Sequence, residues 1–170
     1  MRLAVKMSGF AFATAVLGVT LVPGATTYAA SGEEVIKARI NFMNEDLDKK
    51  NWRVLAAFAA KGQGSLADVE KAANALAGLA EKIPGHFPKD TGRGDYPDKL
   101  TRSLPDIWMN WEGFNKDVRT LADQSRTLAR LAREGQKDAV VEIIGKSGRY
   151  SQTKLGCSEC HESFRGPTVK

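Results

Sequence analysis

Apolar residues recur at steps of three and four along most of the chain after Glu33, which is the spacing of amphipathic helices. Four segments follow this pattern: residues 33–61, 65–83, 103–135 and 136–164. In the first segment the steps slip only across Lys50 and Asn51. No segment shows a persuasive period of two, so we expect an all-α protein.

Polar and helix-breaking residues predict where these helices begin and end. Ser65, followed three residues later by Asp68, is typical of a capping box, and Ser103 is expected to cap the third helix. Residues 84–102 contain three prolines and three glycines, which predicts one long loop. Two short turns and one long loop between four helices predict an antiparallel four-helix bundle.

The fourth predicted helix contains three glycines, each of which costs up to about 1 kcal/mol relative to alanine inside a helix. They are Gly145, Gly148 and Gly156. We expect them where a cofactor or a neighbouring helix comes close. Arg165 lies one turn after His161, where its charge either modulates the proximal side of a cofactor bound there or belongs to a solvated cation favoured by the helix dipole.

The first 29 residues have the pattern of a secretory signal peptide. Two basic residues precede the charge-free residues 7–22, and small residues lie before a predicted cleavage after Ala29. An uncleaved anchor is the alternative, but residues 7–22 are short for a membrane span of roughly 20 residues. We therefore expect an exported, periplasmic domain of residues 30–170 without stable membrane insertion.

Composition narrows the function classes further. The whole chain carries a formal charge of +5, and removal of Arg2 and Lys6 with the signal peptide leaves +3. No cluster of Lys and Arg interleaved with aromatic residues is present in the sequence, which argues against nucleic acid as a partner. Two cysteines are too few for a disulfide scaffold.

Both cysteines lie in one pentapeptide, Cys157-Ser-Glu-Cys160-His161. Two cysteines separated by two residues and followed directly by histidine are typical of covalent haem attachment. The thiols add across the two vinyl groups, and the adjacent imidazole reaches the iron. The sequence therefore predicts one covalently bound haem c.

Paired cysteines next to a histidine are also compatible with three other kinds of site. A disulfide oxidoreductase needs the motif in a βαβ context, and no strand is predicted. A structural zinc site needs four ligands, and only His86 and carboxylates remain to complete it. A plain disulfide leaves His161 unexplained.

The motif with its continuation Glu-Ser-Phe-Arg, the stretch Pro105–Phe114 and the stretch Arg39–Met43 resemble the class II c-type cytochromes. This is the family of cytochrome c′ and its low-spin, methionine-ligated relatives. The resemblance implies a four-helix bundle with haem attached near the C-terminus and His161 as the proximal ligand. It also implies that Arg39 lies near the haem propionates and that Trp108 and Trp111 pack near the porphyrin.

Met43 is the candidate for the sixth iron ligand. In an up-down-up-down bundle the start of the first helix and the end of the fourth lie at the same end, so Met43 and His161 can face each other. Arg39 lies one turn before Met43 on nearly the same face. The alternative is that Met43 only fills the core, as most buried methionines do. Met109 should point outward, and His86 is expected in the loop rather than on the iron.

These observations favour a non-enzymatic cytochrome that transfers single electrons between redox partner proteins, with Met43 and His161 as axial ligands. The alternative is a five-coordinate haem that binds nitric oxide or another small gas, as cytochrome c′ does. A peroxidase-like enzyme is less favoured, because it needs a polar acid/base pair and the residues around Ile40 and Met43 are mostly apolar. A homodimer is possible for either function.

Overall fold

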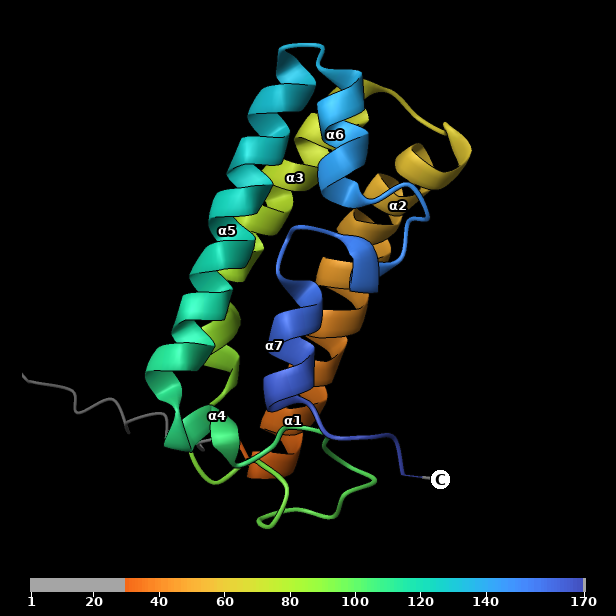
Figure 1. The fold of residues 1–170 in the computed structure, drawn as a ribbon. Coiled ribbons are helices and arrows are strands. Elements are labelled where there is room, and N and C mark those ends of the chain that lie inside the picture. The colour runs from red at the N-terminus through yellow and green to blue at the C-terminus, as the bar shows by residue number, and fades with distance from the viewer. Residues whose placement is uncertain (1–29, 170) are drawn as a thin grey trace, which may run out of the picture.

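The computed structural model describes residues 30–169 as a four-helix bundle, which confirms the predicted fold class (Figure 1). The predicted signal peptide lies outside the described residues. Within them, no helix is both long enough and apolar enough to cross a membrane. The chain runs up and down the bundle, so the first helix and the last helical segment meet at one end (Figure 1).

The first helix has three parts that follow one another without a turn. They are α1 (Gly32–Asn41), the π-helix η1 (Phe42–Trp52) and α2 (Arg53–Lys61). The π-helix contains the position where the apolar steps slip, because its wider turns take up additional residues. Within it, the Asn51 side-chain amide donates a hydrogen bond of 2.6 Å to the backbone carbonyl of Asp46.

The second and third helices pack against each other along the bundle (Figure 1). Helix α3 (Leu66–Ala80) begins with the predicted capping box of Ser65 and Asp68. The predicted cap at Ser103 is wrong, because a short helix α4 (Asp106–Met109) precedes the long helix α5 (Trp111–Arg133). The side chain of Asn110 accepts a hydrogen bond from the Gly113 amide and caps α5 instead.

The fourth predicted helix is broken, and this corrects the sequence prediction. It consists of α6 (Lys137–Ile144), the 3₁₀ turn η3 (Tyr150–Gln152) and α7 (Cys157–Phe164). Gly145, Gly148 and Gly156 have φ angles of +88°, +63° and +83°, which helical residues do not adopt. These glycines therefore end α6 and form the turns that set α7 apart from α6 (Figure 1).

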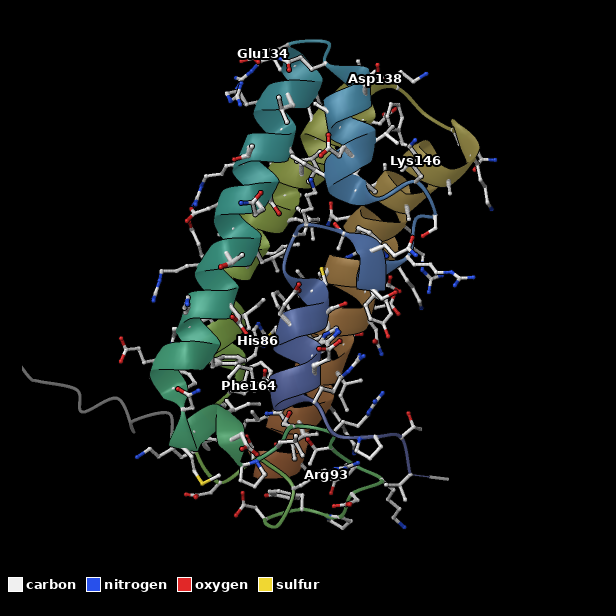
Figure 2. The ribbon with its side chains drawn as sticks, in the orientation of Figure 1. His86, Arg93, Glu134, Asp138, Lys146 and Phe164 are labelled. Carbon is white, nitrogen blue, oxygen red and sulfur yellow. The ribbon has the colours of Figure 1, made fainter. Side chains whose placement is uncertain are left out.

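The predicted loop closes the end of the bundle beside α1 and α4 (Figure 1). It starts with the 3₁₀ turn η2 (Ile83–His86) and runs to Ser103, where a β-bridge joins it to Arg165. Figure 2 places Arg93 of this loop at the end of the bundle opposite Glu134. The loop is thereby tied to the segment that follows α7.

Candidate haem site

The haem-attachment motif occupies α7, and both thiols face the interior. Cys157 and Cys160 are free, half-buried and packed against the hydrophobic core. Burial raises the pKa of the Cys157 thiol to about 11 and that of Cys160 to about 12. The thiols are therefore neutral, whereas a Cys-x-x-Cys redox motif depends on a lowered thiol pKa.

A central cavity of about 600 Å³ lies between α7, the first helix and α5. All five predicted site residues line it: Arg39, Met43, Cys157, Cys160 and His161. Its size falls in the range of ~300–1,000 Å³ usual for cofactor sites. The bundle therefore brings together residues separated by more than a hundred positions in the sequence.

His161 lies one residue after Cys160 on α7 and is held neutral. Burial, assisted by the charges of Arg165 and Arg102, lowers the pKa of its imidazole to about 4. Its Nδ1 atom is buried and has no hydrogen-bond partner among residues 30–169. A neutral imidazole keeps a nitrogen lone pair available, which is the form that binds a metal.

The wall opposite α7 is formed by the first helix and is mainly apolar. Ile40, Met43 and Leu47 line the cavity there, and Met43 also packs against the hydrophobic core. Asp48 is the acidic group of this wall, and its carboxylate is paired with Arg53 at 2.9 Å. The first helix therefore contributes no unpaired carboxylate to this wall of the cavity.

Arg39 is buried and is held by the loop. Its guanidinium donates hydrogen bonds to the Thr91 hydroxyl at 3.0 Å, the Thr91 carbonyl at 2.8 Å and the Thr101 hydroxyl at 2.9 Å. It also lies 4.7 Å from the ring centre of Phe87. Burial lowers its pKa to about 10. Arg39 therefore fixes the loop as well as lining the cavity, and its contact with a propionate stays a prediction.

Four residues outside the predicted ligand set also had predicted positions, and the structure agrees with some of these predictions and not with others. Met109 is 76% exposed, as predicted. His86 stacks on Phe42 with ring centres 4.0 Å apart and does not line the cavity. Trp108 and Trp111 also do not line it, contrary to expectation: Trp108 donates a hydrogen bond to the Phe87 carbonyl, and Trp111 is 40% exposed.

The aromatic residue that does reach the cavity from α5 is Phe114. It packs edge-on against Phe164 of α7 with ring centres 5.4 Å apart, and against Phe87 of the loop at 5.0 Å. Figure 2 shows Phe164 on α7 where this helix faces α5. This aromatic cluster joins α5, α7 and the loop beneath the attachment motif.

Sequence reasoning missed Tyr150 and Arg102. Tyr150 falls within the continuous helix predicted over residues 136–164, but the break in that helix leaves it 46% exposed and edge-on to His161, with ring centres 5.8 Å apart. Arg102 ends the loop and lines the cavity. A polar residue in a loop gives no sequence signal of such a position.

The donor set and its surroundings fit a covalently bound haem. Two neutral thiols and a neutral imidazole lie on one helix at the edge of a largely apolar cavity. Among residues 30–169, no group of three or more His, Cys, Asp or Glu is placed to hold a metal ion, which argues against the zinc interpretation. The fold and site together define a helical-bundle c-type cytochrome.

Comparison with known proteins identifies the family. The family model described as Cytochrome C′ matches residues 34–165, so the chain belongs to the cytochrome c′ family and binds covalently attached haem c. It is 28% identical to cytochrome c′ of Allochromatium vinosum over 156 residues, covering 90% of this chain and 94% of that protein. It is likewise 28% identical over 131 residues to cytochrome c′ of Halomonas halodenitrificans, covering 74% of this chain and 94% of that protein.

Solved structures agree with this assignment. Cytochrome c′ from Rhodobacter sphaeroides matches with a TM-score of 0.63 and 28% identity, covering 81% of this chain and 98% of that structure. A second cytochrome c′, described as having ligand-controlled dimer dissociation, matches with a TM-score of 0.59 and 29% identity, covering 82% of this chain and all of that structure. The chain is therefore a haem c-type cytochrome with the bundle of this family.

Proposed function

We propose that this cytochrome keeps its haem iron five-coordinate, with His161 as its protein ligand, and binds nitric oxide or another small gas on the opposite side. The apolar wall of Ile40, Met43 and Leu47 across the cavity from His161 is the observation that carries the proposal. The relatives, which are cytochromes c′, support it. This reverses the order of the two functions expected from the sequence.

The residues of the site have separate roles in this proposal. Cys157 and Cys160 anchor the cofactor through thioether bonds, and His161 donates its imidazole nitrogen. The haem supplies an iron with an open sixth position. The apolar wall excludes water and anions, because a polar ligand loses its hydrogen bonds on entering an apolar site. A neutral diatomic gas loses little there and is favoured.

The second candidate is electron transfer with Met43 as the sixth ligand. Its support is that Met43 lines the same cavity as His161 and lies on the wall opposite it. A thioether favours ferrous over ferric iron and keeps both states six-coordinate, which limits rearrangement during electron transfer. The two candidates differ only in whether the sulfur of Met43 is bound to iron.

Spectra of the purified holoprotein test the choice. Gas binding predicts high-spin ferric and ferrous spectra at neutral pH, no sulfur-to-iron charge-transfer band, and binding of carbon monoxide and nitric oxide to the ferrous protein. In Met43→Ala these spectra should stay high-spin. A low-spin spectrum that becomes high-spin in Met43→Ala, but not in Met109→Ala, would instead establish methionine ligation.

The setting of this function is part of the proposal. The signal-peptide pattern of residues 1–29 supports export to the periplasm. The dimeric relative supports a homodimer. Redox partner proteins would reduce the iron, and no catalytic turnover is assigned to the chain. Intact-mass analysis of the periplasmic fraction tests export, since the mature protein should begin near Ala30.

A further inference from the structure

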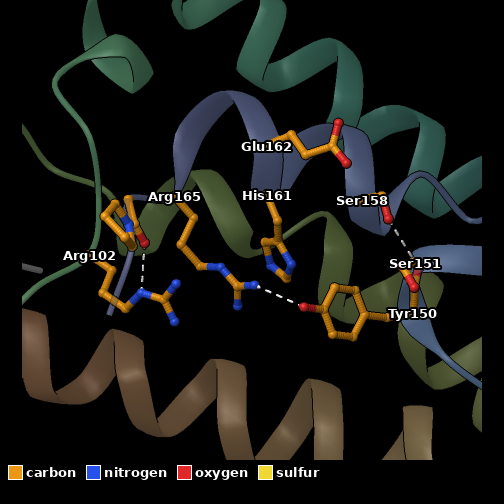
Figure 3. A pocket seen from close by; sticks show the side chains of 9 residues that line it. Arg102, Tyr150, Ser151, Ser158, His161, Glu162 and Arg165 are labelled. Carbon is orange, nitrogen blue, oxygen red and sulfur yellow. Dashed lines mark hydrogen bonds between the residues drawn. The ribbon is translucent and has the colours of Figure 1, made fainter. Parts of the chain in front are cut away.

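A second, smaller pocket lies outside the central cavity, on the outer side of His161. This outer pocket has a volume of about 210 Å³ (Figure 3). Four residues line both spaces: Arg102, Tyr150, His161 and Arg165. Ser151 and Ser158 complete its polar wall. The two spaces therefore share the proximal histidine as part of a common wall.

Two guanidinium groups meet at this pocket, and neither is paired with a carboxylate. Arg102 donates through Nε to the Gly166 carbonyl at 2.8 Å, and Arg165 donates to the Tyr150 hydroxyl at 3.5 Å. Among the described residues, neither lies within ion-pair distance of an acid. Glu162 also lines the pocket, but its carboxylate lies on the far side from both guanidinium groups (Figure 3).

Most other arginines of the described surface have an acidic partner, which Arg102 and Arg165 lack. Five other arginines each lie within 4.0 Å of an acidic side chain, namely Arg53, Arg93, Arg126, Arg130 and Arg133, whereas Arg119 and Arg149 have no such partner among the described residues. At the outer pocket, burial and the neighbouring charges of Arg165 and Arg93 lower the pKa of Arg102. Two cations held together by neutral acceptors repel each other, and a bound anion would remove that repulsion.

We propose that Arg102 and Arg165 form a binding site for a small oxyanion of the sulfate or phosphate class, placed against the outer edge of His161. Both guanidinium groups line the same pocket and have further N–H groups that can donate. Such a pair of planar donors suits an oxyanion with several acceptor oxygens. The Tyr150 hydroxyl, which accepts from Arg165, keeps its own proton to donate to the same anion.

Occupation of this site would affect the iron through the histidine beside it. A negative charge near the proximal ligand stabilises ferric iron more than ferrous iron, because the ferric site carries one more positive charge. By linkage, the ferric protein must then bind the anion more tightly than the ferrous protein. The proposal concerns the pocket outside the central cavity and holds for either candidate function.

Titration of the ferric holoprotein with sodium sulfate, at ionic strength held constant with sodium chloride, tests the site. Calorimetry should show saturable binding of one sulfate per chain. Arg102→Gln and Arg165→Gln should each raise the dissociation constant by about tenfold or more, as expected for loss of a charged hydrogen bond. Arg126→Gln removes the same charge from a paired surface position and should leave the constant unchanged.

Two further measurements keep the outcome decisive. Saturating sulfate should lower the midpoint potential of the wild-type protein but not that of Arg165→Gln. Arg102→Lys keeps the charge and should weaken binding less than Arg102→Gln, which separates a site effect from misfolding. Absence of saturable binding, as when the haem propionates already occupy both guanidinium groups, overturns the proposal. Equal binding by all variants also overturns it and indicates an adventitious ion only.

Discussion

Replacement of Gly145 by alanine tests the break between α6 and α7. A broken helix and a continuous helix predict opposite changes in the free energy of unfolding. Gly145 has φ +88° and ψ 127°, a conformation open mainly to glycine. A Cβ atom there would lie 2.7 Å from the backbone carbonyl oxygen of Gln152. If residues 136–164 were one continuous helix, the same substitution would instead stabilise the protein.

The expected magnitude follows from three contributions. A side chain forced into this backbone region costs about 1–3 kcal/mol. The contact with Gln152 adds to that cost, because the neighbouring atom is backbone and cannot move aside as a flexible side chain can. Alanine also lowers the conformational entropy of the unfolded chain, which stabilises the folded protein by about 0.4–1 kcal/mol. We therefore expect Gly145→Ala to lower the free energy of unfolding by about 1–3 kcal/mol.

Urea unfolding of the holoprotein, followed by far-UV circular dichroism, measures this change. Gly78→Ala is the matched control, since Gly78 lies inside α3 with nothing within 4 Å of the added Cβ. That control should gain about 0.5–1 kcal/mol, as alanine does in a helix interior. A Gly145→Ala protein as stable as the control would refute the break in the fourth helix.

The remaining predictions concern the cofactor and pH. Replacing both Cys157 and Cys160 by alanine should prevent accumulation of holoprotein and leave no haem on the chain after denaturing electrophoresis, because no thioether can form. Met43→Ala should speed carbon monoxide association measured by flash photolysis, since it opens the apolar wall, whereas Met109→Ala should not. Burial, followed by the charge of Arg39, lowers the pKa of His86, so the unfolded chain binds its proton first as pH falls. The unfolding free energy should therefore decrease as pH falls below about 6.5, and less so in His86→Gln; equal pH profiles for the two proteins would contradict this.

The sequence predicted those parts of the fold that depend on a repeating pattern. The apolar steps predicted the first three helices, and the haem motif predicted Cys157, Cys160 and His161, which line the central cavity. The slip at Lys50 and Asn51 coincided with the π-helix, although its extent, Phe42–Trp52, has no pattern of its own. Met43 and Arg39 were brought to the cavity because bundle topology fixes which helix ends meet.

The errors arose where tertiary contacts override local pattern. The glycines of the fourth segment are compatible with a costly helix or with turns, and only their positive φ angles decide between the two. Trp111 shares the spacing of its helix face, yet the start of α5 extends beyond the cavity and leaves it exposed. Tyr150 lies beside His161 because those turns fold the chain back, and Arg102 lies there because the loop is bonded to the segment after α7.

The π-helix η1 fixes how α1 is turned relative to α2, so the first helix tolerates substitutions and deletions differently. Residues of α1 and of η1 itself line the cavity, among them Arg39, Met43 and Leu47, while α2 buries Leu55 and Phe58 in the core at the other end of the bundle. Loss of one residue of η1 after Met43 would turn α1 and Met43 by about 100° relative to α2 and carry Met43 away from His161. Substitution at Met43 leaves that register intact. The apolar wall of the cavity can therefore diversify by point substitution, whereas insertions and deletions are restricted in this stretch.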